Sequence, residues 1–336
     1  MTKNKSKDMV VVTGGAGFIG SNLVAALEEK GIGRIVVCDI YGSDERWQNL
    51  NKRALYYIIH PETLPDYLAR YAREIDAVFH MGAISATTER DVDLIVRSNI
   101  TLSQSLCDWC AENGARFIYA SSAATYGDGD QGFKDGESLD HLNSLKPLNA
   151  YGWSKNMFDK AFQIRLQNGE AVPEQWAGLK FFNVYGPNEY HKDDMMSVIC
   201  KLYPQIMDGQ KAKLFTSHKD EYEDGGQLRD FVYVKDCVAV MLWLYDNPDV
   251  SGLFNVGTGK AQSFKELAEA TFKAAGKDPQ IEYIPMPEHL REKYQYFTEA
   301  DMNKLHEAGY TGTFRNLEDG VRDYVHNYMA TDDKFV

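Results

Sequence analysis

A short apolar strand that runs directly into a glycine-rich turn constrains this chain more than any other feature. Residues 9–20 read MVVVTGGAGFIG, in which Gly14, Gly17 and Gly20 form a G-x-x-G-x-x-G pattern. In a dinucleotide-binding turn the first glycine allows the tight bend, the second lets the backbone approach a pyrophosphate, and the third lets the helix pack close to the strand. The helix that follows directs its free N–H groups and the positive end of its dipole at the phosphates.

The flanking sequence distinguishes this turn from an ordinary glycine loop. Leu23 and Leu27 give the next segment a helical apolar face, and a second strand, Arg34–Cys38, ends in Asp39. An acid about 20 residues after the glycines is where a dinucleotide fold meets the ribose. A lone glycine pattern is a weak signal, but this context favours dinucleotide binding over a plain strand-turn-helix.

Composition describes an acidic globular protein with room for about two domains. The 336 residues are 44% hydrophobic and 25% charged, and 36 Lys and Arg against 49 Asp and Glu give a net charge of −13. That charge disfavours general binding to nucleic acid or anionic lipid, although a local basic site is still compatible with it.

The sequence contains neither a signal peptide nor an apolar run long enough to cross a membrane. The polar stretch at residues 1–8 lacks the apolar region of a signal peptide, and the longest apolar run, Cys237–Tyr245, is too short to span a bilayer. We therefore expect a cytoplasmic protein that contacts neither membrane nor nucleic acid.

The five cysteines suit reduced, buried thiols. Cys107 and Cys110 form a C-x-x-C, but it lies inside a helical pattern and no second pair completes a zinc site. We expect core thiols and no metal.

Strands alternate with helices through the first half of the chain, which predicts an α/β fold with a doubly wound parallel Rossmann sheet. We expect residues 9–183 to form the dinucleotide-binding domain, with elements at about 231–258 returning to it. A smaller, interleaved mixed α/β substrate domain should comprise residues 184–230 and 259–330. The expected strands after the first are Arg34–Cys38, Tyr56–Ile59, Asp76–His80, Ala115–Ala120, Leu179–Asn183, Phe231–Val234, Phe254–Val256 and Ile281–Ile284. The expected long helices are Val92–Asn113, Tyr151–Leu166, Met195–Met207 and Cys237–Tyr245.

Ligands in such sheets bind beyond the carboxyl ends of the strands. Polar loops follow apolar strands at residues 13–20, 39–46, 81–89, 121–127 and 183–194. These loops are where we expect the site.

A tyrosine and a lysine spaced for one helix face carry the candidate chemistry. Tyr151 and Lys155 lie at i and i+4, and Ser122 follows a sheet strand. A nearby ammonium and a cationic nicotinamide favour the phenolate, which makes the tyrosine a usable base, while the serine hydroxyl can donate to the substrate oxygen. A Y-x-x-x-K pair also occurs by chance on helix surfaces, so its weight comes from the glycine turn and from SSAATYG at a strand end.

The motifs TGGAGFIG, SSAATYG and YGWSK, in this order, resemble the extended short-chain dehydrogenase/reductase superfamily, whose members act on nucleotide sugars. More narrowly, HMGAISATTE, NAYGWSK, FFNVYGPNEYHK, RDFVYVKD and LFNVGTG resemble the family of ADP-L-glycero-D-manno-heptose 6-epimerases, over residues 9 to about 328.

The narrower resemblance implies an epimerase with tightly bound NADP. The cofactor removes hydride from C6 of ADP-D-glycero-D-manno-heptose to leave a 6-ketone, then returns it to the opposite face to give the L-glycero epimer used in the lipopolysaccharide core. The family pattern makes Tyr151 one acid/base and Lys192 the second. Without that resemblance, Lys192 reads as a solvated lysine in the charged run His191–Asp194.

The resemblance also implies two sets of binding residues. Those expected at the cofactor are Gly14, Gly17, Phe18, Ile19, Gly20, Asp39, Ile40, Arg46, Met81, Gly82, Ala83, Ile84, Ser85, Asn99, Lys155, Val184 and Lys192. Those expected at the ADP-heptose are Ser122, Asn183, Asp194, Lys201, Phe215, Thr216, Ser217, His218, Arg229 and Tyr294.

The cofactor loop departs from the family pattern at two positions and leaves NADP and NAD both open. Ile40 replaces an asparagine, and Arg46 replaces the lysine expected at a 2′-phosphate, which arginine binds at least as well. Asp39, however, suits the unphosphorylated ribose of NAD.

The substrate region departs as well. Asp194 and Lys201 replace a serine and a histidine, and the loop 218–226 is long and acidic. Arg229 suits a diphosphate, but an ion pair with Asp230 or Asp236 explains it equally well from sequence. His80 ends a strand and reads as a packed, hydrogen-bonded residue.

Three rival functions remain: a UDP- or dTDP-sugar 4-epimerase or dehydratase, a dehydrogenase with net redox turnover, and a cofactor-sensing protein without catalysis. The TTE loop and Lys192 disfavour the first, and the presence of Ser122, Tyr151 and Lys155 disfavours the last. The resemblance also implies a homo-oligomer, such as a pentameric ring.

Overall fold

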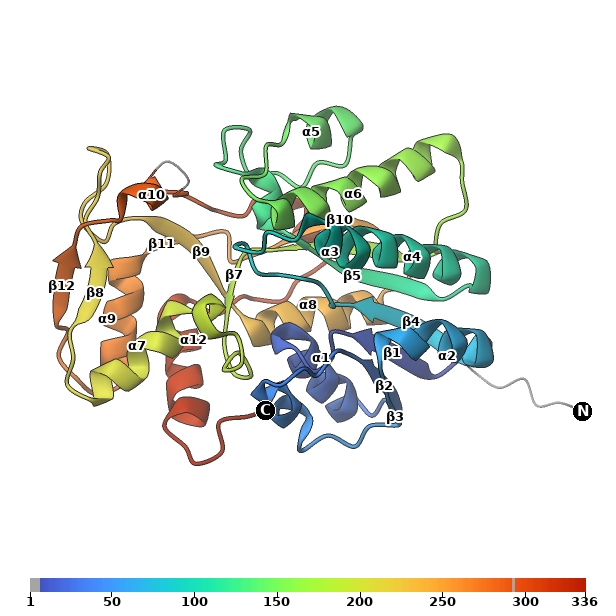
Figure 1. Ribbon diagram of the computed structural model, residues 1–336, viewed down its shortest axis with the longest axis horizontal. Coiled ribbons are helices and arrows are strands. Elements are labelled where there is room, and N and C mark those ends of the chain that lie inside the picture. Colours follow the sequence, from blue (N-terminus) through green and yellow to red (C-terminus); the bar gives the residue numbers. More distant parts are fainter. Residues whose placement is uncertain (1–6, 292–293) are drawn as a thin grey trace, which may run out of the picture.

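The computed structural model describes residues 7–291 and 294–336, so most of the polar stretch at residues 1–8 lies outside the described residues. Its centre is a seven-stranded parallel sheet with the strand order β10-β6-β5-β4-β1-β2-β3 (Figure 1). The strands are β1 (Met9–Thr13), β2 (Arg34–Cys38), β3 (Tyr57–Ile59), β4 (Ile75–His80), β5 (Arg116–Ser122), β6 (Trp176–Phe181) and β10 (Gly252–Val256). The order 3-2-1-4-5-6 is that of a dinucleotide fold, and the predicted doubly wound Rossmann sheet is confirmed.

Helices cover both faces of this sheet, which is why its central strands can be apolar runs rather than alternating patterns. Figure 1 shows α1 and α8 below the sheet and α3, α4 and α6 above it. These helices are α1 (Phe18–Glu29), α8 (Val234–Asp246), α3 (Val92–Ile95), α4 (Leu102–Asn113) and α6 (Ala150–Asn168). Shorter helical segments on this part of the chain are η1 (Glu45–Leu50), η2 (Pro61–Thr63), α2 (Leu64–Tyr71), η4 (Ala123–Tyr126) and α5 (Leu139–Ser144).

The predicted helix Val92–Asn113 is confirmed as one helical run with an irregular middle. Between α3 and α4 the segment η3 (Val96–Thr101) has π-helical bonding. A π turn inside an α-helix is often found at a functional position, and here it contains Asn99.

Two small sheets and the remaining helices form the other part of the molecule. A three-stranded sheet has the order β11-β9-β7, and a two-stranded sheet pairs β12 with β8. Their bounds are β7 (Asn183–Tyr185), β8 (Ala212–Phe215), β9 (Leu228–Tyr233), β11 (Ala261–Ser263) and β12 (Ile281–Ile284). The helices are η5 (Asp193–Met195), α7 (Val198–Met207), α9 (Phe264–Ala274), α10 (Glu288–Arg291), α11 (Asn303–Glu307), α12 (Leu317–Tyr324) and η6 (Val325–Met329).

Three predicted elements differ from the structure. The strand predicted to return to the main sheet at 231–234 does not do so: β9 pairs with β7 and β11, because β10 occupies the place beside β6. The strand predicted at 179–183 is split, since Phe182 leaves the ladder, donating its N–H to Val256 and accepting from Val184. The helix predicted at 195–207 begins at Val198, where Ser197 caps it by accepting from the Cys200 N–H.

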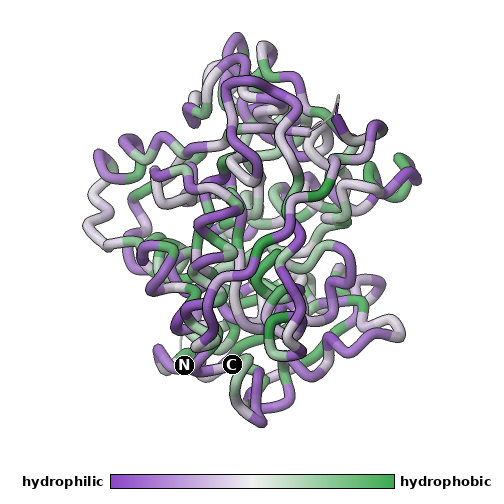
Figure 2. Tube along the Cα trace, turned by 90° about the vertical axis from the view of Figure 1, so that its left-hand side faces the viewer, coloured by the Kyte–Doolittle hydropathy of each residue, from purple (hydrophilic) through white to green (hydrophobic). Residues whose placement is uncertain are grey.

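The apolar interior has one large cluster on the two faces of the main sheet and two smaller ones around α7, α9 and α12. Figure 2 shows hydrophobic segments gathered inside and hydrophilic segments at the periphery. All five cysteines are buried and none forms a disulfide, as predicted for core thiols. Within the described ranges, no helix is both long and apolar enough to cross a bilayer.

Candidate active site

The glycine turn after β1 is packed backbone against backbone. Gly14 has φ +66°, and a Cβ there would lie 2.5 Å from the Cα of Gly82, in the loop after β4. A Cβ on Gly20 would lie 2.1 Å from the carbonyl oxygen of Gly14. These contacts draw the loop after β4, the turn and the start of α1 together, which fits the tight bend predicted at Gly14 and the close packing predicted at Gly20.

The N-terminus of α1 fits a phosphate group. Gly17 is the N-cap residue and supplies no side-chain cap, and the first intrahelical bond runs from Ser21 N–H to the Gly17 carbonyl, 3.0 Å. The N–H groups of Phe18, Ile19 and Gly20 precede that bond and form the first turn of the helix. Uncapped N–H groups at a helix start are the usual protein ligand of a pyrophosphate.

Asp39 ties the end of β2 to this turn. Its carboxylate accepts from the Ala16 N–H and from the Ile40 N–H, both at 2.8 Å. Burial raises the pKa of Asp39, and these N–H groups and the nearby Arg46 oppose that rise. The Ile40 side chain is 54% exposed beside it.

Arg46 lies near Asp39 but is bonded chiefly to Asp44. Its Nη1 is 3.8 Å from the Asp39 carboxylate, whereas Nε and Nη2 donate to the Asp44 carboxylate at 2.9 and 2.6 Å. The guanidinium of Arg46 therefore lies next to Asp39, the residue predicted to bind the ribose. To bind a 2′-phosphate, Arg46 would have to release its hydrogen bonds to Asp44.

The Asn99 side chain hydrogen-bonds the loop after β4 and does not point into an open site. Its side chain accepts from the Ile84 N–H at 2.8 Å and donates to the Ile84 carbonyl and the Ser154 hydroxyl, both at 3.0 Å. Any contribution of Asn99 to cofactor binding therefore passes through the loop 81–85 that it holds.

His80 is a packed residue, as predicted. Thr13 and Ser103 hydrogen-bond its two ring nitrogens at 2.6 and 2.8 Å, and complete burial lowers its pKa to about 3. The histidine is neutral and joins β4 to β1 and to α4.

Lys155 and Tyr151 occupy the first two turns of α6. Lys155 is 4% exposed and donates to the Ala120 carbonyl at 2.7 Å, and burial lowers its pKa to about 8, opposed by Asp159. Burial raises the pKa of Tyr151, and a hydrogen bond with Ser122 opposes that rise only in part. The predicted effect on the phenolate combines Lys155 with a bound nicotinamide cation, so it stays a prediction for the cofactor-bound protein.

Lys192 is not the solvated lysine that its charged neighbours suggest. It is half-buried, and its ammonium lies 4.9 Å from the ring centroid of Phe18, the first residue of α1. Burial lowers the pKa of Lys192, with Glu189 opposing the change. The second predicted acid/base thus lies against the helix that begins at the glycine turn, and its depressed pKa suits proton transfer.

A rigid loop holds Lys192. The buried Glu189 carboxylate accepts from the Ser197 N–H at 2.5 Å and the Ser197 hydroxyl at 2.7 Å, while Asn49 donates to the Asn188 carbonyl at 3.1 Å and the Ala16 carbonyl at 2.8 Å. The same amide group of Asn49 therefore ties this loop to the glycine turn.

The other residues predicted on this side of the site are accessible. Asn183 is exposed at the start of β7 and Val184 follows it half-buried. Lys201 donates to the backbone carbonyl of Asp194 at 2.6 Å, so these two predicted substrate residues lie together.

Arg229 is a buried cation with neither of the predicted ion-pair partners. It is 8% exposed, its guanidinium lies 5.4 Å from the ring of Tyr294, and it donates to the carbonyls of Leu228 and Gln295. Asp230 instead accepts from residues 258, 259 and 300, and Asp236 pairs with Arg315. The ion-pair explanation of Arg229 is therefore wrong.

Most of the residues predicted around the nucleotide gather near Arg229. The rings of Phe215 and Tyr294 are 6.2 Å apart, and the hydroxyl of Tyr296 hydrogen-bonds the His218 ring at 2.7 Å and accepts from the His218 N–H. Thr216 instead donates its N–H to the carbonyl of Ile284 on β12. The Ser217 hydroxyl donates to the backbone carbonyl of Lys219.

Sequence reasoning missed Tyr296 and Tyr222, whose rings are 4.8 Å apart in the same cluster. The segment Y-Q-Y at 294–296 carried a signal, because alternate residues of an extended chain face the same side.

Comparison with known proteins shows the family of this chain. Residues 10–257 match the NAD dependent epimerase/dehydratase family. A protein from Nitratidesulfovibrio vulgaris named ADP-L-glycero-D-manno-heptose-6-epimerase is 53% identical over 98% of this chain and 100% of its own length.

Solved structures give the same picture. The crystal structure of Helicobacter pylori ADP-L-glycero-D-manno-heptose-6-epimerase has a TM-score of 0.77 and 28% identity, covering 97% of this chain and 98% of its own. The Thermus thermophilus UDP-glucose 4-epimerase complex with NAD has a TM-score of 0.74 and 25% identity, covering 94% and 97%.

Proposed function

This chain belongs to the NAD dependent epimerase/dehydratase family and, within it, to the ADP-L-glycero-D-manno-heptose-6-epimerases, and we propose that Tyr151 and Lys192 are the two acid/bases of its reaction. The reaction inverts C6 of the heptose in ADP-D-glycero-D-manno-heptose and gives the L-glycero epimer. The observation that carries the assignment of roles is a second, half-buried lysine with a depressed pKa beside the glycine turn, in addition to Tyr151 next to Ser122.

The first half of the reaction uses the residues of α6 and β5. A nicotinamide dinucleotide, when bound, supplies an acceptor for the C6 hydride and later a donor of the same hydride. Tyr151 takes the proton of the C6 hydroxyl while Ser122 donates a hydrogen bond to the same oxygen, which becomes the carbonyl oxygen of a 6-ketone. Lys155 holds the nicotinamide ribose and keeps a positive charge beside the phenolate.

The second half needs a proton donor in a new direction. C6 is exocyclic, so rotation about one carbon–carbon bond turns the other face of the ketone toward the same hydride donor. The oxygen then faces Lys192, which donates the proton as the hydride returns to carbon. No net oxidation occurs, and the lowered pKa of Lys192 makes its ammonium a better proton donor than that of a solvated lysine.

Arg229 and the aromatic cluster suit the ADP moiety. The buried guanidinium lies among two carbonyls and two rings and pairs with neither Asp230 nor Asp236, and a diphosphate would offer it two acceptor oxygens in the geometry that arginine prefers. Phe215 and Tyr294 offer ring surfaces for the adenine.

For the cofactor we propose NADP, with Arg46 on its 2′-phosphate. The Asp39 carboxylate already accepts two N–H groups, and Arg46 stands 3.8 Å from it. Replacing Arg46 by alanine should weaken NADP binding about tenfold or more and leave NAD binding within about twofold, because only NADP carries the extra phosphate. Equilibrium titration of the nucleotide-free protein checks this, and an equal loss for both nucleotides would contradict it.

The test of the function is conversion without added cofactor. Purified, nucleotide-loaded protein should interconvert the two C6 epimers of ADP-glycero-manno-heptose with no net rise in reduced-nicotinamide absorbance. A stoichiometric rise would indicate a dehydrogenase, and turnover of UDP-glucose in place of the heptose would indicate the 4-epimerase alternative. Failure of well-folded, loaded protein to convert either sugar would leave the assignment without support.

The predicted cytoplasmic location, the supply of heptose to a lipopolysaccharide core and the predicted homo-oligomeric ring stay proposals. Sedimentation of the purified protein at several concentrations would measure the oligomeric state.

A further inference from the structure

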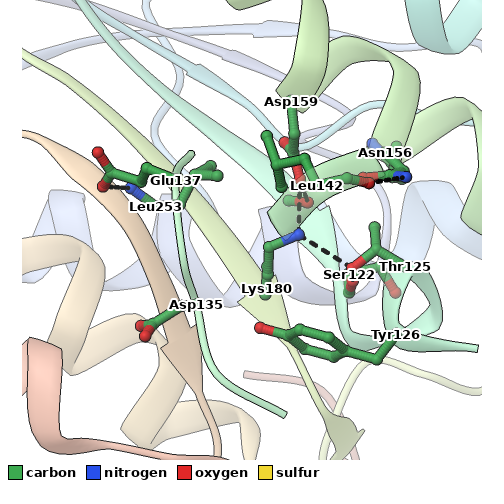
Figure 3. Close-up of polar contacts among 12 residues, drawn as sticks. Ser122, Thr125, Tyr126, Asp135, Glu137, Leu142, Asn156, Asp159, Lys180 and Leu253 are labelled. Atoms are coloured by element: carbon green, nitrogen blue, oxygen red, sulfur yellow. Dashed lines mark hydrogen bonds and ion pairs between the residues drawn. The ribbon is translucent and has the colours of Figure 1, made fainter. Parts of the chain in front are cut away.

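A fully buried ion pair joins β6 to α6, the helix that carries Tyr151 and Lys155. Lys180 on β6 and Asp159 on α6 are both 0% exposed in their side chains, and the ammonium is 2.7 Å from the carboxylate. Figure 3 shows Lys180 between Asp159 on one side and Thr125 on the other, with the Tyr126 ring below it. None of the motifs that indicated the function includes Lys180 or Asp159 as a functional residue.

This pair is unusually well satisfied. The Asp159 carboxylate also accepts from the Tyr119 hydroxyl at 2.9 Å and the Ser121 hydroxyl at 2.8 Å, and Lys180 also donates to the Thr125 hydroxyl at 2.9 Å. Burying two charges is costly, and a pair of apolar residues of the same volume is often as stable or more so. Stability alone is therefore a weak reason for such a network in the middle of a sheet.

The network instead leads to the residues that do the chemistry. The Thr125 hydroxyl, which accepts from Lys180, donates to the Ser122 carbonyl at 2.8 Å. Asp159 lies one helical turn beyond Lys155 on α6, and its charge opposes the loss of the proton from Lys155. The pair thus contacts the Ser122 turn at one end and faces Lys155 at the other.

We propose that Lys180 and Asp159 are positioning residues for the reaction: Lys180 fixes the turn that carries Ser122, and Asp159 supplies the negative charge that faces Lys155. This inference rests on the proposed roles of Ser122, Tyr151 and Lys155, and it adds a reason for the position of both charges in the core. Neither residue touches the substrate in this scheme.

Of the titratable groups that face Lys155, Asp159 is the one whose charge acts on its pKa. From β4, His80 faces Lys155 but is neutral, because its pKa is lowered to about 3. From its own helix, the pKa of Tyr151 is raised, so that residue is neutral too. From β5, Tyr119 is an uncharged donor to Asp159, and Lys180 on β6 is already paired with it.

The test removes the charges without leaving one of them unpaired. The double variant Asp159→Asn, Lys180→Met keeps the side-chain volumes, and we expect it to fold with a Tm close to that of the wild type. Without the carboxylate, the Lys155 titration midpoint should fall by about one pH unit. Protein labelled with ¹³C at the lysine side chains reports that midpoint by NMR, with the Lys155 signal assigned by its loss in Lys155→Met.

Kinetics should follow the same shift. In the double variant the alkaline limb of the kcat profile should move to lower pH by about one unit, with kcat down about tenfold above the new midpoint and KM little changed. The single variant Lys180→Arg, which keeps Asp159 and a cation paired with it, should keep both the midpoint and the rate of the wild type.

Asp76 provides a matched control at the other end of the sheet. The Asp76 carboxylate pairs with Arg116 and accepts a hydrogen bond from the Tyr245 hydroxyl. Like Asp159, it therefore combines an ion pair with a tyrosine donor. Asp76→Asn should lower the Tm and leave the Lys155 midpoint and the pH profile unchanged.

The outcomes separate this inference from the proposed function. A double variant that loses stability but keeps the wild-type Lys155 midpoint would overturn the positioning role and leave a structural one. That NMR result holds whatever the sugar is. Wild-type protein that fails to convert the heptose would instead count against the proposed function.

Discussion

Arg229 is a buried guanidinium whose sequence neighbours Asp230 and Asp236 are bonded elsewhere, and in the proposal it pairs with the diphosphate of the substrate. Arg229→Met keeps much of the side-chain volume but removes the donors. We expect KM for the ADP-heptose to rise by about tenfold to a hundredfold, because hydrogen bonds to a charged group contribute about 1.5–3 kcal/mol. Steady-state kinetics checks this.

The matched control for Arg229 is Arg315→Met, which breaks the ion pair with Asp236 away from the aromatic cluster. This change should lower the Tm and leave KM unaltered. Equal KM values in Arg229→Met and wild type would remove Arg229 from the substrate site.

Lys192 carries the second acid/base role in the proposal. Replacing it with methionine should lower the epimerisation rate by about a hundredfold or more, the usual loss when a general acid/base is removed. The rate is measured by resolving the two C6 epimers over time. Lys211→Met, at an exposed lysine, serves as the control and should keep the wild-type rate; a similar rate in Lys192→Met would exclude Lys192 from the mechanism.

At the scale of elements, the close approach of α6 to η4 places Tyr151 beside Ser122. A Cβ on Gly152 would lie 2.5 Å from the carbonyl oxygen of Ala124, and because that atom is backbone, one of the two elements would have to move. We expect Gly152→Ala to lower kcat by about tenfold to a hundredfold through misplacement of Tyr151, with a loss of about 1–3 kcal/mol in unfolding free energy. Kinetics and chemical denaturation measure the two effects.

Gly33 is the control for that substitution, because no atom lies within 4 Å of a Cβ built on it. Gly33→Ala should change neither quantity. A Gly152→Ala protein with normal kcat would show that α6 can retreat without disturbing the site.

The elements that could be predicted are those whose sequence signal is local. The strands 9–13 and 34–38 are buried on both faces and therefore read as apolar runs, and the turn from the first strand into α1 needs glycine for steric reasons. The partners of β9 could not be predicted, because they depend on β10 taking the place beside β6. The same holds for Lys180, since a charge inside an apolar strand reveals its partner only when α6 is packed on the sheet.

At the scale of the whole molecule, His80 links global stability to pH. Its pKa is lowered to about 3 in the folded protein from an ordinary value of 6.5, so the unfolded chain binds more protons between these values. The contribution of His80 is fully present above pH 6.5 and is lost as the pH falls toward 3, a change of roughly 5 kcal/mol in unfolding free energy.

His80→Gln removes this titration and should flatten the rise of unfolding free energy between about pH 4 and pH 6.5, which denaturant titrations at several pH values would show. The exposed His60→Gln should keep the wild-type slope. Identical slopes for His80→Gln and wild type would contradict the neutral, buried state of this histidine.

Phe182 is the single residue between β6 in the main sheet and β7 in the smaller one, and its N–H is bonded to β10. So short a connection limits how far the two sheets can move relative to each other, and we expect the proposed dinucleotide and sugar-nucleotide regions to shift little on binding. Binding should then require little further ordering of the backbone. Each ligand should meet a preorganised surface, and occupancy of one site should change the affinity of the other only slightly.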